Sequence, residues 1–480
     1  MASKPKRMRI EQDSMGEMEV PSFALYGATT QRAVLNFPIS GRPIPISIIY
    51  AFALLKRSAA IANTKLKLLD TYQSDLIVYA CDEVMAALDD PHRVGGMMTH
   101  FPIDVFQTGS GTSTNMNMNE VLSNIACKEA GMKIGSKNPV HPNDHVNMGQ
   151  SSNDTFPTAM QLAACRELRE VLIPALKGLR KSLKVKVKKW DKVVTIGRTH
   201  LMDATPIRMG QIFSGYEAAI EYGIFRAERA MMRLAENMPI GGTAVGTGIN
   251  THPKFASLVC RELSKATKVS FKEAANHFEA QATRDCVVEA HGELKTIATS
   301  LSKIANDIRW LGSGPRCGLF ELTLPAVQPG SSIMPGKVNP VICEAAMQVF
   351  CQVVGNDVAI TTASCGGVGS ILELNLCMPV IAERLTESIM LLAGTVSTLD
   401  EKLIQGLEVN KEIAEGLVEQ SLMVGTILAP VIGYDQTSNI AKEAFKTGET
   451  IREIVLRKGL LNADELDSYL NFREMTEPHG

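Results

Sequence analysis

Long apolar stripes at helical spacing dominate the chain. Between 287 and 308, apolar residues recur alternately three and four positions apart, which keeps one seam along a helix for three heptads. A second stripe at 209–234 has charged residues in the intervening positions. Both patterns predict long helices that pack against other helices. Similar patterns predict further helices at 48–69, 158–189, 344–359 and 380–399.

Pro174 lies inside the predicted helix 158–189. We expect it to kink or split that helix, because proline lacks a backbone N–H and clashes with the preceding turn. Strand-like alternation is rare, with a short β-leaning run at 193–196, and no strand–helix–strand series occurs. The pattern therefore predicts a mainly α fold with a central bundle of long helices.

Polar segments rich in Gly, Asn, Ser and Thr separate the helical stretches. Such long loops are more often functional than accidental. Near Gly406 the pattern changes to shorter pieces. We expect a mixed, mostly helical N-terminal domain at 1–149, a central long-helix domain at 150–404 and a small helical C-terminal domain at 405–480. The polar segments lie at 107–119, 138–156, 195–207, 241–253 and 326–340.

Composition narrows the class of protein. The 480 residues include 49 Lys and Arg against 51 Asp and Glu, a net charge of −2, which disfavours nucleic-acid binding because phosphate neutralisation needs excess cations. The longest uncharged apolar run, 48–55, is far shorter than the ~18 residues of a membrane span. We therefore expect neither a nucleic acid nor a membrane as partner.

The cysteines and the N-terminus suggest a compartment. The ten cysteines are scattered without a Cys-x-x-Cys pair, so we expect reduced, mostly buried thiols rather than a zinc site. No apolar stretch follows the basic N-terminus, and Glu11, Asp13 and Glu17 interrupt any Arg-rich presequence. These features predict a cytoplasmic enzyme.

Two segments offer anion donors. Residues 108–120 place hydroxyl and amide side chains around two glycines, and 150–155 repeats this chemistry before a long helix, whose N-terminal end favours an anion. The alternative reading for 108–120 is a turn and cap at a helix start. For the second segment, the alternative is capping by Ser152, Asn153 or Asp154.

Histidines raise two further possibilities. His200 follows the β-leaning run beside Asp203; a lone histidine is usually structural, but nearby anion donors favour proton transfer. The run 141–145 holds two imidazoles and a carboxylate, which invites a metal hypothesis. Pro142 disrupts the helical face that two histidine ligands would share, so we expect no metal there.

The loop 330–339 carries the strongest chemical signal. It superficially resembles a phosphate-binding P-loop, but five residues separate Gly330 from Gly336, and Val338 follows the lysine where Ser or Thr should stand. A nucleotide site is therefore excluded. The loop instead presents two hydroxyls, Lys337 and an amide before Glu344. A serine that loses its proton needs such a nearby cation.

At these motifs the chain resembles the fumarase/aspartase superfamily and, within it, the class II fumarate hydratase family. The likeness covers nearly the whole chain, and the combination of Thr-Gly-Ser-Gly-Thr with Gln-Ser-Ser-Asn-Asp points to fumarase. The resemblance implies the fumarase/aspartase-type fold and no metal or other cofactor. It also implies a homotetramer whose long helices form a shared core and whose active sites gather loops from three subunits. The matching segments are 108–120, 141–157, 197–206, 241–252, 311–316 and 330–344.

The resemblance also implies roles for individual residues. Ser331 would be the base that removes a proton from C3 of malate, and Lys337 would stabilise the aci-carboxylate intermediate. His200, paired with Glu344, would assist departure of the C2 hydroxyl. A peripheral dicarboxylate site would use His141, Asn143 and Asp144. The remaining substrate contacts would be Ser110, Thr112, Asn115, Ser151, Ser152, Asn153, Thr199 and Asn339.

Some positions depart from the family pattern. Asn138, beside Lys137, stands where the peripheral site usually begins with a basic residue, which predicts that this site is weak or absent. Met148 replaces a usual lysine, a feature that some aspartases share, and the loop 364–370 is a few residues longer than usual.

Two alternative functions compete with fumarate hydration. Aspartate ammonia-lyase uses the same fold and base, but aspartases typically carry Thr in place of Ser152. A non-catalytic helical scaffold is the other alternative, and retention of the full set of catalytic residues argues against it.

Overall fold

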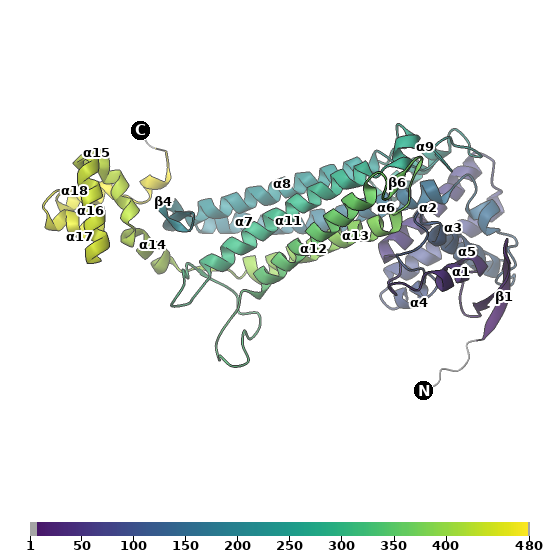
Figure 1. The fold of residues 1–480 in the computed structure, drawn as a ribbon, viewed down its shortest axis with the longest axis horizontal. Helices are drawn as coiled ribbons and strands as arrows, with labels where there is room; N and C mark the ends of the chain where they lie inside the picture. The colour runs from purple at the N-terminus through teal and green to yellow at the C-terminus, as the bar shows by residue number, and fades with distance from the viewer. Residues whose placement is uncertain (1–6, 479–480) are drawn as a thin grey trace. The chain divides into compact units, whose positions relative to one another are not determined.

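The computed structural model describes residues 7–478 and is mainly helical, as predicted (Figure 1). The apolar stripes form α8 (Met209–Ala235) and α11 (Asp285–Leu311), and two further long helices are α12 (Val341–Ser364) and α13 (Met378–Leu399). The seam of α11 is buried, with Leu294, Leu301 and Ile308 almost inaccessible to solvent. The mainly α class and the long helices are therefore confirmed.

The predicted helix 158–189 is interrupted near Pro174. The chain forms α6 (Ser152–Glu167), one π-helical turn (Leu168–Leu172) and α7 (Ile173–Lys189). Pro174 lies in the first turn of α7, where its missing N–H matters least, and the wider π turn directly before it absorbs the change in hydrogen bonding.

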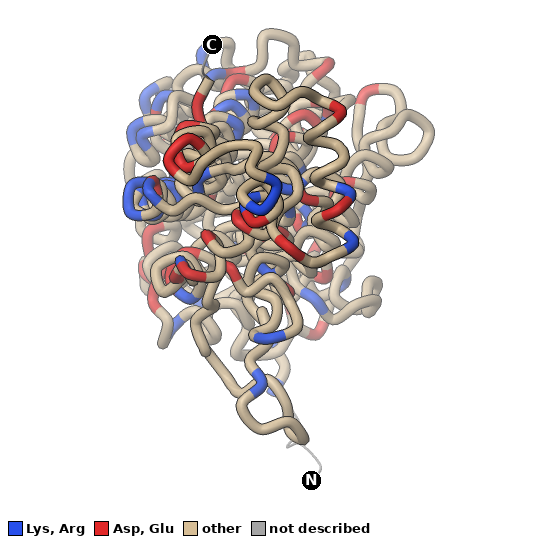
Figure 2. The backbone as a smooth tube through the Cα atoms, turned by 90° about the vertical axis from the view of Figure 1, so that its left-hand side faces the viewer, with Lys and Arg blue, Asp and Glu red and all other residues tan. Residues whose placement is uncertain are grey.

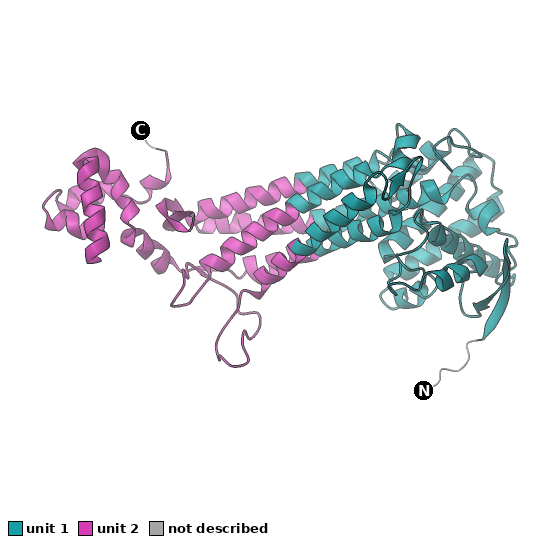
Figure 3. Ribbon diagram, viewed as in Figure 1, with its two compact units in different colours: residues 1–173, 225–296, 351–393 teal, residues 174–224, 297–350, 394–480 magenta. Residues whose placement is uncertain are grey.

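The chain divides into two compact units (Figure 3). Unit 1 comprises residues 1–173, 225–296 and 351–393, and unit 2 comprises residues 174–224, 297–350 and 394–480. Each unit combines segments that are far apart in the sequence. The three-domain division along the chain, 1–149, 150–404 and 405–480, follows other boundaries and stays a prediction; residues 1–6 and 479–480 of it lie outside the described residues.

Unit 1 begins with a hairpin that the sequence pattern did not reveal. Strands β1 (Met8–Asp13) and β2 (Gly16–Pro21) pair antiparallel, and the guanidinium of Arg9 donates to the carbonyls of Pro21, Ala24 and Tyr26. Local propensity is weak here, so these long-range bonds decide the conformation. The helices that follow are α1 (Ala28–Asn36), α2 (Ile46–Lys65), α3 (Thr71–Asp89), α4 (Val94–Met98), α5 (Thr112–Glu129), α9 (Phe255–Thr267) and α10 (His277–Ala282).

Helix α2 is long and apolar enough to cross a membrane by length and composition, but 72% of its most apolar window is buried inside the fold. It contacts α3, α6 and α9. A core helix passes the same test of length and hydropathy as a membrane span, and the burial of α2 supports the core reading.

Unit 2 contains a second hairpin, β3 (Val194–Thr199) and β4 (Met202–Arg208), whose first strand coincides with the β-leaning run of the sequence. Its last part consists of short helices around a small core that includes Val418, Ile440 and Ile454. These helices are α14 (Lys411–Gln420), α15 (Ala429–Ile432), α16 (Tyr434–Thr447), α17 (Ile451–Arg457) and α18 (Ala463–Tyr469). Figure 2 colours the backbone by residue type, and Lys and Arg positions are interspersed with Asp and Glu positions along it, as expected for a nearly neutral chain.

Candidate active site

Two glycines shape the loop that leads into α5. Gly111 is the N-cap of α5 with φ +72°, and a Cβ there would lie 2.0 Å from the ring of Phe156. A Cβ on Gly109 would lie 1.7 Å from the carbonyl oxygen of Leu376. Only glycine allows this close approach of backbone to its neighbours. The loop is therefore held between α6 and the segment that precedes α13.

A chain of hydroxyl groups joins the N-termini of α5 and α6. Ser110 Oγ lies 2.7 Å from Thr112 Oγ1, which lies 2.7 Å from Ser152 Oγ. Thr112 and Ser152 are the first residues of α5 and α6. Helix N-termini carry unpaired N–H groups and partial positive charge, so this cluster can bind an anionic group. The structure thus brings both predicted anion-donor segments together.

The cap of α6 differs from the expectation. Ser151, rather than Ser152 or Asn153, is the N-cap and accepts from the N–H of Asn153, while Asp154 accepts from the N–H of Ser151 to complete a capping box. The hydroxyl of Ser152 is therefore not used for capping and faces Thr112. The Asn153 amide donates to the carbonyl of Ala244 at 2.8 Å.

A buried lysine that the sequence motifs do not reveal lies beneath this cluster. Lys56 is fully buried in α2 and donates to Asn147 Oδ1 at 2.9 Å and to Gln150 Oε1 at 3.0 Å. Asn115 donates to the same Asn147 oxygen at 3.2 Å. The available signal was a charge within the apolar face of the predicted helix 48–69.

Burial perturbs two titratable groups here. Burial lowers the pKa of Lys56 to about 7, against the attraction of Asp154. Burial raises the pKa of Asp154 to about 7, against hydrogen bonds from the backbone N–H groups of Ser151, Thr243 and Gly241. A charged form of either group therefore depends on its hydrogen bonds and on the opposite charge.

His200 lies at the tip of the β3–β4 hairpin. His200 and Leu201 have φ of +57° and +63°, so the two-residue turn between Thr199 and Met202 is of type I′. Non-glycine residues rarely adopt this conformation, and such strain is concentrated at functional sites. Fully buried Glu321 fixes the hairpin at two points: its carboxylate pairs with Arg198, next to the tip, at 2.6 Å, and accepts from the hydroxyl of Thr195, nearer the base. Thr199 and His200 are exposed.

The loop around Ser331 is closed by its own hydrogen bonds. Gly330 N–H donates to the carbonyl of Lys337 at 2.8 Å, and Asn339 Nδ2 donates to the carbonyl of Gly330 at 2.7 Å. Ser331 Oγ accepts from the N–H groups of Ile333 and Met334 at 3.2 and 3.1 Å. Two N–H donors stabilise negative charge on an oxygen, so this geometry favours the alkoxide of Ser331.

The predicted site residues form two groups. Ser110, Thr112, Asn115, Ser151, Ser152 and Asn153 lie in unit 1, and Thr199, His200, Ser331, Lys337, Asn339 and Glu344 lie in unit 2. Lys337 and Glu344 are exposed. Within residues 7–478 of one chain, His200 and Glu344 make no ion pair with each other. Their pairing stays a prediction.

Two of the proposed peripheral residues, His141 and Asn143, line a cavity of about 380 Å³ in unit 1, and Asp144 follows them in the chain. The Nδ1 atom of His141 accepts from the N–H groups of Asn143 and Asp144, and Lys137 donates to the carbonyl of Gln12. Both the imidazole and the ammonium thus have partners inside the protein. In the described part of the chain, no group of three or more His, Cys, Asp or Glu residues could hold a metal ion.

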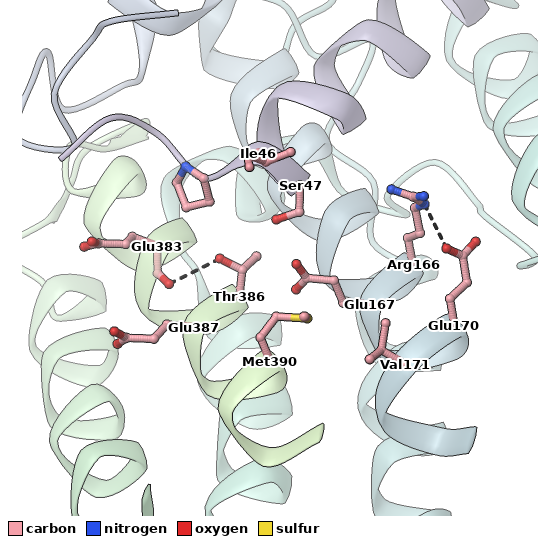
Figure 4. Close-up of a pocket in the computed structure, with 11 residues that line it drawn as sticks. Ile46, Ser47, Arg166, Glu167, Glu170, Val171, Glu383, Thr386, Glu387 and Met390 are labelled. Atoms are coloured by element: carbon pink, nitrogen blue, oxygen red, sulfur yellow. Dashed lines mark hydrogen bonds and ion pairs between the residues drawn. The ribbon is translucent and has the colours of Figure 1, made fainter. Parts of the chain in front are cut away.

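A cavity of about 500 Å³ elsewhere in unit 1 contains none of the predicted site residues. Figure 4 shows Glu167 pointing toward Ser47 and Thr386 across this cavity. Burial raises the pKa of Glu167 to about 8, opposed by a hydrogen bond with Ser47 and by Arg166. This carboxyl is therefore mostly protonated at neutral pH.

Comparison with known proteins identifies the family to which this chain is similar. Residues 16–355 match a lyase family and residues 425–477 match the fumarase C C-terminus family. The class II fumarate hydratase 2 of Bradyrhizobium diazoefficiens is 48% identical over 471 residues, which cover 98% of this chain and 97% of the relative. The chain belongs to the class II fumarate hydratase family.

Relatives of this family also include eukaryotic and structurally solved members. The mitochondrial fumarate hydratase of Danio rerio is 48% identical over 473 residues, covering 98% of this chain and 90% of the relative. The crystal structure of a class II fumarase from Schistosoma mansoni has a TM-score of 0.92 at 38% identity, covering 99% of this chain and all of that one. The family resemblance read from the motifs is confirmed.

Proposed function

We propose that this protein is a fumarate hydratase, which catalyses the reversible hydration of fumarate to (S)-malate in the tricarboxylic acid cycle. The observation that carries the proposal is the hydroxyl chain from Ser110 through Thr112 to Ser152 at the joined N-termini of two helices. This cluster suits one carboxylate of a small dicarboxylate. Full-length similarity to fumarate hydratases supports the choice of substrate.

Ser331 is the proposed base. It would take the proton from C3 of malate, and the electron pair would delocalise into the adjacent carboxylate to form an aci-carboxylate. The N–H groups of Ile333 and Met334 support this role because they stabilise the serine alkoxide. Lys337 from the same loop, with Asn339, would bind that carboxylate as its negative charge grows.

His200 is the proposed acid. It would give a proton to the C2 hydroxyl, which leaves as water while the C2–C3 double bond forms. Thr199 would contact substrate beside it, and Glu344 would support the imidazolium charge. Because His200 and Glu344 are exposed on each chain, we propose a homotetramer in which loops from different subunits complete each site.

The remaining proposals concern the periphery and the compartment. We propose that the second dicarboxylate site at His141, Asn143 and Asp144 is weak, because Asn138 supplies no charge and Lys137 is hydrogen-bonded to Gln12.

We propose a cytoplasmic location, although the Danio rerio relative is named mitochondrial. Cell fractionation against a mitochondrial matrix marker tests this location.

The direct test follows the ultraviolet absorbance of fumarate with purified protein, in plain buffer and with ammonium, and identifies the product. We expect malate without ammonium. Aspartate formed only with ammonium would identify an aspartate ammonia-lyase. No turnover in either buffer would favour a non-catalytic scaffold.

A further inference from the structure

The side-chain oxygen of Asn147 is a shared acceptor. It accepts from Lys56 Nζ at 2.9 Å, from Asn115 Nδ2 at 3.2 Å and from Asn119 Nδ2 at 3.2 Å. Its own Nδ2 donates to the carbonyl of Gln150 at 3.0 Å. An amide oxygen has only two lone pairs, so three donors demand a strongly polarised acceptor. The ammonium of Lys56 supplies that polarisation, because charge-assisted hydrogen bonds are about twice as strong as neutral ones.

This arrangement determines how the Asn115 amide is oriented. Asn115 Nδ2 faces Asn147, and Asn115 Oδ1 accepts from Thr155 Oγ1 at 3.1 Å. Rotation of the amide by 180° would place an N–H against the Thr155 hydroxyl and an oxygen against the Asn147 oxygen. The latter contact is repulsive, so one orientation is selected and the second N–H of Asn115 keeps a defined direction.

The second hydrogen bond of Lys56, to Gln150, fixes the segment directly before α6. Gln150 Oε1 accepts from Lys56, and Gln150 Nε2 donates to the carbonyls of Val146 and Met148 at 3.1 and 3.2 Å. Gln150 directly precedes Ser151 and Ser152. The turn that delivers their hydroxyls is thus held by a residue that Lys56 anchors.

We propose that Lys56 is a positioning residue of the substrate site, which through Asn147 and Gln150 orients the Asn115 amide and the Ser151–Ser152 turn toward a substrate carboxylate. This inference rests on the proposed function for the identity of the ligand. The titratable groups that face Lys56 are Asp154 and Cys81, and because burial raises the pKa of the Cys81 thiol, only Asp154 can offer a negative charge. A buried ammonium is costly unless it is hydrogen-bonded, and an apolar side chain would fit this helix face at lower cost. The presence of a lysine is therefore explained by its hydrogen bonds to Asn147 and Gln150, which an apolar side chain cannot make.

Lys56→Met removes the charge and both hydrogen bonds while keeping an unbranched side chain. We expect KM for fumarate and the dissociation constant of succinate, an unreactive dicarboxylate, to rise at least tenfold, while kcat falls less than threefold. A contact that binds the ground state and the transition state equally has this signature. The matched control is Arg57→Met, the next residue of α2, whose surface pair with Asp82 lies outside the network and whose loss should change neither constant.

A double-mutant cycle separates positioning from a general structural effect. Asn147→Leu should raise the succinate dissociation constant by a similar factor. The double variant should have a succinate dissociation constant only slightly above that of whichever single variant binds succinate less tightly, because both changes interrupt the same path of hydrogen bonds. Effects that multiply would overturn the proposal, as would a folded Lys56→Met protein with unchanged succinate binding. If Lys56→Met fails to fold, Asn147→Leu alone decides, and unchanged succinate binding in it would refute the path.

The outcomes also separate this inference from the proposed function. A wild-type protein that binds succinate but does not convert fumarate would contradict the proposed function and leave the binding test of Lys56 valid. A wild-type protein that binds neither dicarboxylate would contradict both.

Discussion

At the residue scale, the site depends on the small number of hydrogen bonds that each polar side chain makes. Ser331 Oγ accepts from two N–H groups, while Lys56 makes its hydrogen bonds in complete burial. Hydrogen bonds in such surroundings are stronger than in water, and unpaired groups are costly. Single substitutions here should therefore change either the chemistry or the stability, and the two kinds of effect can be distinguished.

Ser331→Ala should lower kcat by about 100-fold or more, because the proposed base contributes on that order to the rate. The loop is partly exposed, so water can replace the lost acceptor and the fold should persist. The matched control is Ser332→Ala, the adjacent hydroxyl, which should keep most of the activity. Steady-state kinetics with circular dichroism measures both; equal loss in the two variants would contradict the base assignment.

Glu167→Gln should stabilise the protein at alkaline pH. The pKa of Glu167 is raised to about 8 in the fold, so the folded state holds a proton that the unfolded state releases above about pH 4.5. The contribution of Glu167 to the free energy of unfolding is therefore fully present below about pH 4.5 and is lost as the pH rises to about 8. At pH 8.5 we expect a gain of up to about 5 kcal/mol from the variant, since the pKa shift of roughly 3.5 corresponds to about 1.4 kcal/mol per pKa unit, and little gain near pH 5.

Denaturant unfolding at the two pH values measures this difference. Glu170→Gln is the control, because Glu170 is a half-exposed partner of Arg166 and surface pairs contribute little. A gain for Glu167→Gln that is the same at both pH values would show that ionisation is not its cause.

At the scale of elements, helix starts and hairpin tips set the directions of the site groups. The loop before α5 closes against Phe156 and Leu376, and the turn of β3–β4 holds two residues with positive φ. The hairpin β1–β2 and the bonds that hold the Ser331 loop were not predictable, because they join residues whose local propensities are weak. The breaks at Pro174 and the long stripes were predictable, because they follow from backbone geometry and periodicity.

Gly111→Ala should cost more stability than Gly131→Ala. Both glycines have φ above +70°, so each alanine pays about 1–2 kcal/mol for the left-handed conformation. A Cβ at Gly131 meets nothing within 4 Å, whereas at Gly111 it meets the Phe156 ring. Overpacking should add about 1–3 kcal/mol at Gly111. If chemical denaturation showed equal losses of unfolding free energy in the two variants, the Phe156 ring would have moved away from the added Cβ at no cost.

At the scale of the whole molecule, we propose that the active site is completed by loops from more than one chain. Ser331 and Lys337 lie on a loop, His200 on a hairpin turn and Glu344 in the first turn of α12, and within residues 7–478 Lys337, Glu344 and His200 form no ion pairs with one another. A tetramer with shared sites would explain why these groups are presented at the surface rather than assembled internally.

Complementation between inactive variants tests the shared site. Ser331→Ala and His200→Asn should each be nearly inactive alone. Hybrids formed by co-expression should regain a measurable fraction of wild-type kcat, because some sites combine an intact Ser331 from one chain with an intact His200 from another. Ser331→Ala with Lys337→Met is the control: every loop then carries a lesion, so no site is restored. Recovery in the control, or none in the first pair, would contradict a site shared in this way.

The sequence by itself determined the helix lengths, the interruption at Pro174 and the chemical character of each motif, because periodicity, proline geometry and side-chain chemistry are local properties. It also carried the family likeness, since the motifs remain in order along the chain. Only the tertiary structure decided that Ser151 caps α6, that Thr112 meets Ser152 and that Lys56 lies beneath Asn147. Thr112 and Ser152 are 40 positions apart and Lys56 and Asn147 are 91 positions apart, and packing rather than local preference selects such distant partners.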